Sequence, residues 1–247
     1  MSAALAAGGW GLLAGSALVI GALIGYLVRV PAVVIASVMA FGSGVLISAV
    51  SFELIGEAYD LAGMPPTVVG AAAGALLYTG ANLALARYGA RHRKRSGEQQ
   101  QAEAGSGTAI AIGALLDGIP ESIVIGTSLL AGGAVSTVTV AAVFISNVPE
   151  GLSSAAGMRR AGRTTRYVFG VWGGIALASG VAAMLGYGAL GGAPPGLLAT
   201  ITALAGGAML AMIADTMIPE AFEQAHLLIG LITVAGFLTS FGLSQLD

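Results

Sequence analysis

Hydrophobic residues along the chain come in long blocks, and short polar, proline-containing or glycine-rich breaks separate these blocks. Each block is close to the ~20 residues that an α-helix needs to cross a bilayer. The breaks contain helix breakers or charge clusters, so the blocks do not merge into fewer, longer helices. The pattern predicts an all-α integral membrane protein, a single domain over 1–247 with eight transmembrane helices, at roughly 8–28, 31–53, 66–87, 108–131, 134–157, 166–190, 196–218 and 226–245.

The composition fits this prediction, because 56% of the residues are hydrophobic and only 9% are charged. Soluble domains have about 45–50% apolar and about 25% charged residues. Glycine occurs 39 times, which is typical of close contacts between membrane helices, within one protomer or across a homodimer. Cysteine is absent, which excludes disulfides, iron–sulfur clusters and thiol nucleophiles.

The basic residues give the orientation. All ten Lys and Arg fall between predicted spans one and two, three and four, or five and six. With eight spans these connections share one side, which the positive-inside rule identifies as the cytoplasm. We therefore expect a multi-pass protein of the cell membrane with both termini outside the cytoplasm and a polar cytoplasmic loop over 88–107. This anchoring accounts for the basic residues, so the lipid bilayer is an expected partner and a nucleic acid is not.

Two short sequences recur within the chain. Residues 55–60 (IGEAYD) resemble 218–223 (IPEAFE), and residues 117–122 (DGIPES) resemble 146–151 (SNVPEG). In the predicted orientation the members of each pair run in opposite directions across the membrane. The chain is therefore expected to contain inverted repeats in a 3+2+3 arrangement of helices, a layout found in many secondary transporters.

The fourth and fifth predicted spans carry acidic residues at mid-depth. Asp117 and Glu121 share one face of the fourth span, and Pro120 frees a backbone carbonyl one turn earlier. The fifth span repeats the pattern with Ser146, Asn147 and Glu150 around Pro149. If the two helices pack together, these five polar side chains converge without any Lys, Arg or His to neutralise the carboxylates.

Such a cluster needs a partner, because an ionised side chain at the bilayer centre costs at least ~2.5–3.5 kcal/mol. Protons and water would give neutral, hydrogen-bonded acids at two kinks. A bound divalent cation would use the same oxygen-rich set as a cage, and we favour this interpretation. Weaker candidates for a pathway lie at the outer end of the second span, Glu53 and Glu57, and toward the inner end of the seventh, Asp215 and Glu220.

The eight spans, the outward termini, the cytoplasmic loop and the paired Pro-Glu motifs resemble the ZIP (Zrt/Irt-like) transporters of zinc and related divalent metals. The segment Asn147-Val148-Pro149-Glu150-Gly151 matches the family motif Asn-x-Pro-Glu-Gly. The resemblance implies a binuclear site with Glu121 and Glu150 as bridging ligands. It also places Asp117 and Ser146 at positions usually held by His or another ligand, and Asn147 at its usual ligand position.

The chain departs from this family at several ligand positions. Asp117 and Gly118 replace the usual His and Asn of the fourth span, and Ser179 stands where the sixth span often carries a Glu. A site without imidazole is harder, which leaves the cargo open between zinc, manganese, iron and similar ions. The loss of two ligands also leaves open whether one or two metals bind.

These observations together predict a passive or secondary carrier of divalent metal cations into the cytoplasm, and not an enzyme. The single lysine, Lys94, lies outside any Walker A context, and no HExxH motif or Ser/His pair occurs at depth. The expected cargo is zinc, manganese or iron, with no catalytic cofactor. Two alternatives stay open: a transport-inactive metal sensor or scaffold on a transporter fold, and a proton-linked carrier of a small solute.

Overall fold

The computed structural model describes residues 2–87, 106–132, 137–224 and 228–245. Over these residues the ordered elements are all helical. They are α1 (Ala3–Leu27), α2 (Ala32–Ala49), η1 (Val50–Gly56), α3 (Glu57–Ala62), α4 (Met64–Arg87), α5 (Ser106–Gly132), α6 (Thr137–Arg160), α7 (Thr165–Leu190), α8 (Pro195–Met212), η2 (Ile213–Met217), α9 (Ile218–Gln224) and α10 (Ile229–Ser244). Most of the predicted cytoplasmic loop 88–107 lies outside the described residues.

Six helical stretches within the described residues are long and apolar enough to cross a membrane. They are Ala3–Leu27, Ala32–Ala62, Met64–Leu85, Gly113–Leu130, Thr165–Leu190 and Pro195–Glu223. α6 and α10 are not among these six, because polar residues lower the hydropathy of α6 and α10 has only 16 residues. The fold is therefore that of an all-helical, membrane-embedded protein.

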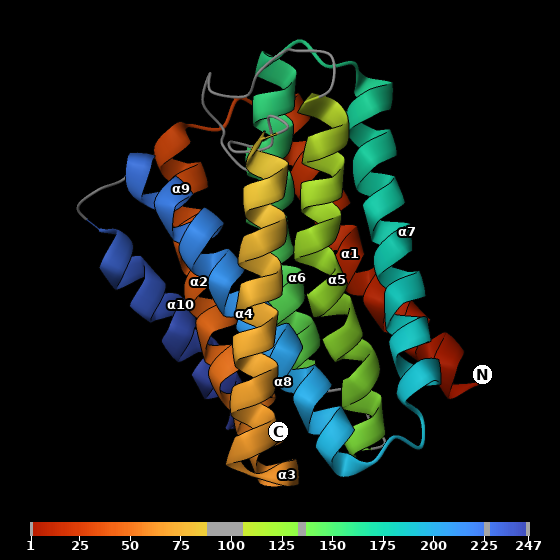
Figure 1. Cartoon of the computed structure of the whole chain (residues 1–247). Coiled ribbons are helices and arrows are strands. Elements are labelled where there is room, and N and C mark those ends of the chain that lie inside the picture. Colours follow the sequence, from red (N-terminus) through yellow and green to blue (C-terminus); the bar gives the residue numbers. More distant parts are fainter. Residues whose placement is uncertain (1, 88–105, 133–136, 225–227, 246–247) are drawn as a thin grey trace.

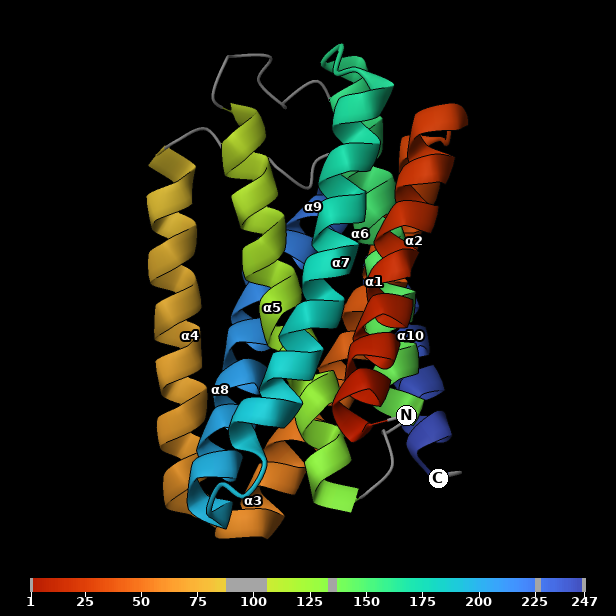
Figure 2. The same cartoon turned by 90° about the vertical axis from the view of Figure 1, so that its right-hand side faces the viewer.

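The helices form one elongated bundle (Figures 1 and 2). α1 packs against α6 and α7, α5 against α7, α2 against α10, and α4 against α8. The start of α1, the end of α10 and helix α3 lie toward the same end of the bundle, while the α1–α2 and α6–α7 connections lie toward the opposite end. We call these two ends the α3 end and the basic end, because Arg29, Arg159 and Arg160 belong to the latter.

Two long helices each contain a π-helical stretch. η1 interrupts the continuous helix 32–62, and η2 interrupts the continuous helix 195–224. Their first residues, Val50 and Ile213, are separated by the same sequence spacing as the echoed residues Ile55 and Ile218. π-helices are rare and frequently occur at functional sites.

Glycines bring the backbones of helix pairs into direct contact. A Cβ atom on Gly44 would collide with the Thr233 carbonyl oxygen of α10, and one on Gly207 would collide with the Ala71 carbonyl oxygen of α4. Gly44 and Gly207 are separated in the sequence by as many residues as the first residues of η1 and η2.

The partner helices contribute glycines to the same two contacts. Gly236 on α10 meets the Phe41 carbonyl of α2, and Gly74 on α4 meets the Leu204 carbonyl of α8. The α2–α10 and α4–α8 contacts are therefore built in the same way.

Candidate functional site

Asp117 and Glu121 lie buried on α5, with 1% and 2% of their surfaces exposed. The hydroxyl of Tyr78, itself buried on α4, donates a hydrogen bond of 2.8 Å to Oδ1 of Asp117. Pro120 lies between the two acids and has no N–H, so the helix lacks one hydrogen bond to the Leu116 carbonyl. The sequence therefore located two buried carboxyl groups, and the structure adds a phenol that holds one of them.

The second polar group lies on α6, where Ser146, Asn147 and Glu150 are all buried. Ser146 donates its hydroxyl proton to the Val143 carbonyl at 2.9 Å, and the Asn147 amide nitrogen donates to the Ala14 carbonyl of α1 at 3.0 Å. Each of these bonds uses an N–H or O–H donor of the side chain. Their oxygen atoms keep acceptor capacity, which is the property that a cation ligand needs.

The two polar groups sit on helices whose main packing partners differ. α6 lies against α1, where Gly21 and Gly151 allow backbone contact, while α5 lies against α7, where Gly126 approaches the Ala183 carbonyl. α5 and α6 touch each other only over a short stretch. In the described part of the chain, no three His, Cys, Asp or Glu side chains are grouped closely enough to hold a metal ion. The expected convergence of three carboxylates is therefore not present among those residues.

Gly118 and Ser179, two of the residues at which the sequence departs from the ZIP pattern that it resembles, lie close together. The Cβ position of Gly118 on α5 would be 3.7 Å from the Ser179 hydroxyl oxygen of α7. The two residues therefore face each other across the contact between α5 and α7.

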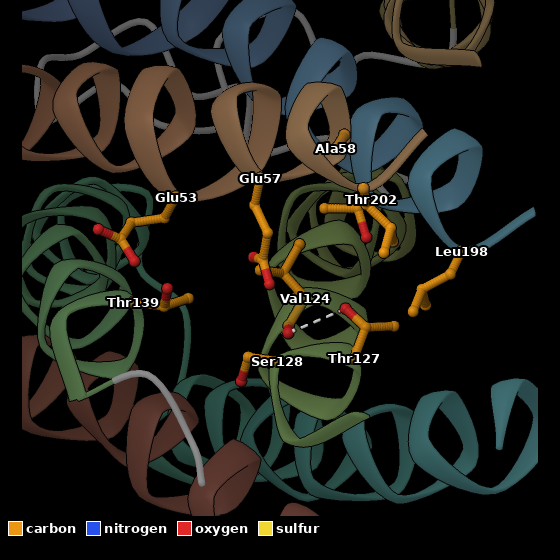
Figure 3. Close-up of a pocket in the computed structure, with 10 residues that line it drawn as sticks. Glu53, Glu57, Ala58, Val124, Thr127, Ser128, Thr139, Leu198 and Thr202 are labelled. Carbon is orange, nitrogen blue, oxygen red and sulfur yellow. Dashed lines mark hydrogen bonds between the residues drawn. The ribbon is translucent and has the colours of Figure 1, made fainter. Parts of the chain in front are cut away.

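A pocket at the α3 end contains two of the weaker candidates, Glu53 and Glu57. Figure 3 shows both side chains extending from their helix toward α5 and α6, with Thr139 and Val124 opposite them. The cavity is small, about 10 Å³, which is room for about one water-sized particle. Its other lining residues include four hydroxyl side chains, Thr127, Ser128, Thr139 and Thr202. The pocket thus offers carboxylate and hydroxyl oxygens to a small, hard ligand.

One face of α5 leads from this pocket to the buried acids. Ser128 and Val124 line the pocket, and Glu121 and Asp117 follow on the same face at helical spacing. The distance along the helix from Ser128 to Asp117 is about 16 Å at 1.5 Å per residue.

α6 has a similar polar face, which leads away from the pocket as the residue numbers rise, whereas on α5 they fall. It begins with Thr139 in the pocket and continues through Ser146 and Glu150 to Ser153 at helical spacing. The Ser153 hydroxyl donates to Oε1 of Glu220 on α9 at 3.0 Å, and both residues are buried. The two faces together connect the pocket at the α3 end with a buried glutamate on the side of the basic end.

The weaker pathway candidates therefore have different environments. Glu53 and Glu57 line the pocket, and Glu220 is buried beside Ser153. Asp215 lies within η2 and is exposed. Tyr78 and Ser153 were not predicted from the sequence. Each is a polar residue inside an apolar span, but such residues are common in membrane helices, where a hydroxyl group often donates a hydrogen bond to a carbonyl of its own helix.

Replacing Tyr78 by phenylalanine tests the contact between α4 and Asp117. We expect the change to lower the free energy of unfolding by about 1.5–3 kcal/mol, because it removes a buried hydrogen bond to a carboxyl group without creating a cavity. Thermal unfolding of the purified protein in detergent measures the loss. In an Asp117→Ala background, which has no acceptor, the same substitution should cost less, and an equal cost in both backgrounds would show that the bond is not responsible.

A comparison of the sequence with protein-family models finds no match, and a comparison with curated proteins finds none either.

Proposed function

We propose that this protein carries a divalent metal cation, zinc, manganese or iron, through the membrane into the cytoplasm. The observation that carries the proposal is the pair of polar faces on α5 and α6, each with a buried Pro-Glu motif. They run from the pocket of Glu53 and Glu57 to Glu220. Buried carboxylates in an apolar bundle need a neutralising partner, and a cation that passes along the faces supplies one.

We further propose eight transmembrane helices in a 3+2+3 arrangement, with α1 to α4 and α7 to α10 as inverted repeats around α5 and α6. Three observations support this arrangement: the common spacing of η1 and η2, the matched glycine contacts of α2–α10 and α4–α8, and the packing of α1 on α6 and of α7 on α5. The basic end then faces the cytoplasm by the positive-inside rule, and both termini lie outside in the cell membrane.

The ligand chemistry supports a hard or borderline divalent ion. Carboxylate, amide and hydroxyl oxygens from Asp117, Glu121, Ser146, Asn147 and Glu150 are ligands suited to such ions. The resemblance to ZIP transporters supports the same assignment, while Gly118 and Ser179 argue for a reduced second metal position. Because α5 and α6 touch only briefly, we propose that the cation draws Glu121 and Glu150 together as helix bundles rock around them.

Uptake into proteoliposomes tests the proposal. The purified protein is reconstituted, and the entry of zinc, manganese, iron(II), cobalt and cadmium is followed against protein-free vesicles. Saturable uptake of at least one metal would support the carrier. Metal binding by the purified protein without uptake would favour the transport-inactive sensor or scaffold, and neither binding nor uptake would favour a proton-linked carrier of a small solute.

The double substitution Glu53→Gln and Glu57→Gln tests the pocket as the entrance. Both carboxylates attract cations to the α3 end, so we expect KM for the metal to rise about tenfold at low ionic strength while kcat changes little. The difference should shrink in high salt, because both carboxylates are only partly buried and salt screens them. Asp60→Asn, which removes an exposed carboxylate of α3 outside the pocket lining, serves as the matched control. An unchanged KM in the double variant would remove the pocket from the pathway.

A further inference from the structure

A second cavity lies at the basic end, between the last turns of α1 and α6. Its volume is about 310 Å³, within the range of about 300–1,000 Å³ that is usual for small-molecule sites. Three arginines line it, Arg29, Arg159 and Arg160, and the other described lining residues are small or apolar. No carboxylate occurs among the described lining residues, so the cavity has a strongly positive wall.

The position of Arg159 is fixed by the fold. Its Nη1 donates a hydrogen bond of 2.7 Å to the carbonyl oxygen of Tyr26, one of the last carbonyls of α1. The Tyr26 hydroxyl accepts a hydrogen bond from Thr165 at 3.1 Å and donates one to the Arg163 carbonyl at 3.3 Å. Tyr26 thereby connects the end of α1 with the α6–α7 connection, and the wall of the cavity is held from two sides.

Capping of helix ends explains only part of this arrangement. Arginine near a helix C-terminus is favoured by the helix dipole, and Arg159 fulfils that role for α1. Arg29 and Arg160 line the same cavity in addition, so three positively charged side chains gather around one space. Arginine is the side chain best suited to bind phosphate, because its guanidinium group offers paired N–H donors.

The surface next to the cavity is apolar and exposed. On the last turns of α1, Leu23, Leu27 and Val28 expose 47%, 62% and 54% of their surfaces. Leu23 and Leu27 are four residues apart and share one face of the helix. An acyl chain could lie along this face while a headgroup phosphate enters the cavity, a combination that a soluble anion cannot use.

We propose that the cavity of Arg29, Arg159 and Arg160 binds the phosphate of an anionic phospholipid, such as phosphatidylglycerol, in the membrane leaflet at the basic end. Basic pockets between transmembrane helices on the cytoplasmic side are known to hold anionic headgroups. The site is independent of the proposed metal pathway, since its lining residues belong to neither polar face of α5 and α6.

The experiment titrates the full-length, delipidated protein in detergent with phosphatidylglycerol, and measures bound lipid by native mass spectrometry. The test variant carries Arg29→Gln and Arg160→Gln, which leaves the Arg159 cap of α1 intact. The matched control carries Arg87→Gln and Arg166→Gln, two exposed arginines that do not line the cavity, so both variants lose the same charge. Each arginine near a membrane surface contributes about a fivefold gain for an anionic lipid, so the test variant should bind about thirtyfold more weakly and the control nearly as wild type.

Two further binding measurements identify the ligand. Phosphatidylcholine with the same acyl chains should bind much more weakly than phosphatidylglycerol, and millimolar inorganic phosphate should not displace the lipid. Equal binding of the two lipids, or equal weakening in the test and control variants, would overturn the proposal. Displacement by inorganic phosphate would assign the cavity to a soluble anion instead. If the double variant does not fold, Arg29→Gln alone should still weaken binding about fivefold.

Discussion

Replacing Glu121 or Glu150 by alanine is expected to lower metal uptake into proteoliposomes by at least about a hundredfold. Substitution of groups that merely support a metal ligand already costs about 10–100-fold, and these residues are the proposed ligands themselves. Both side chains are buried, and each belongs to one of the two Pro-Glu motifs. Initial rates at saturating metal, normalised to the amount of reconstituted protein, measure the effect.

The control for this loss is a pair of acidic residues outside any predicted span, Glu98→Ala and Glu103→Ala, which should transport as wild type does. Glu121→Gln and Glu150→Gln keep the side-chain size and remove the charge, so they separate a missing ligand from a packing defect. Uptake that survives in folded Glu121→Gln and Glu150→Gln variants would contradict the assignment of these residues to the cargo site.

Alanine at Gly44 or Gly207 is expected to prevent normal folding of the bundle. A methyl group at either position would occupy the space of a backbone carbonyl oxygen on the partner helix, Thr233 for Gly44 and Ala71 for Gly207. Backbone atoms cannot rotate away as a side chain does, so the two helices must separate. Overpacking typically costs about 1–3 kcal/mol and here should reach or exceed the upper value. The yield of monodisperse protein and its unfolding temperature in detergent measure the loss.

Gly80→Ala on α4 and Gly242→Ala on α10 are the matched controls, because no atom from elsewhere among the residues that the structure describes lies within 4 Å of their Cβ positions. Both should be neutral or slightly stabilising, since alanine favours a helix over glycine by about 0.5–1 kcal/mol. A stable, monodisperse Gly44→Ala protein would show that α2 and α10 do not meet at this carbonyl.

The described helices follow the sequence closely where hydrophobic blocks and helix breakers define them. α2, α4 and α7 begin within two residues of the predicted spans, because Pro31, Pro65 and the Arg159–Arg166 cluster mark their limits, whereas α1 begins at Ala3, five residues before its predicted start. The sequence did not indicate that the second span continues through η1 to Ala62. The predicted span ended at residue 53, but a helix that is stabilised by packing extends past polar residues such as Glu57 and Asp60.

The candidate site, like the fold, could be predicted from the sequence only in part. Burial of Asp117, Glu121 and Glu150 agrees with their positions inside apolar spans, because the spacing of acids along a helix is visible in the sequence. The partners Tyr78 and Glu220 come from distant helices, and no local pattern links them to Asp117 or Ser153. The exposure of Asp215 has no local signal in the sequence either, because its rotation about the helix axis depends on the π-helical stretch η2, in which it lies.

The π-helical stretches η1 and η2 also determine how the two long helices are able to twist. A π-turn accommodates one residue more than an α-turn, and one residue corresponds to about 100° of rotation in an α-helix. Moving this extra residue along the chain would rotate only the residues that it passes, by about that angle, while the helix on either side keeps its phase and its hydrogen bonds. Glu57 lies directly beyond η1 and Glu220 beyond η2, so a shift of the extra residue past either one would swing a carboxylate at an end of the polar faces without moving the glycine contacts of α2 and α8.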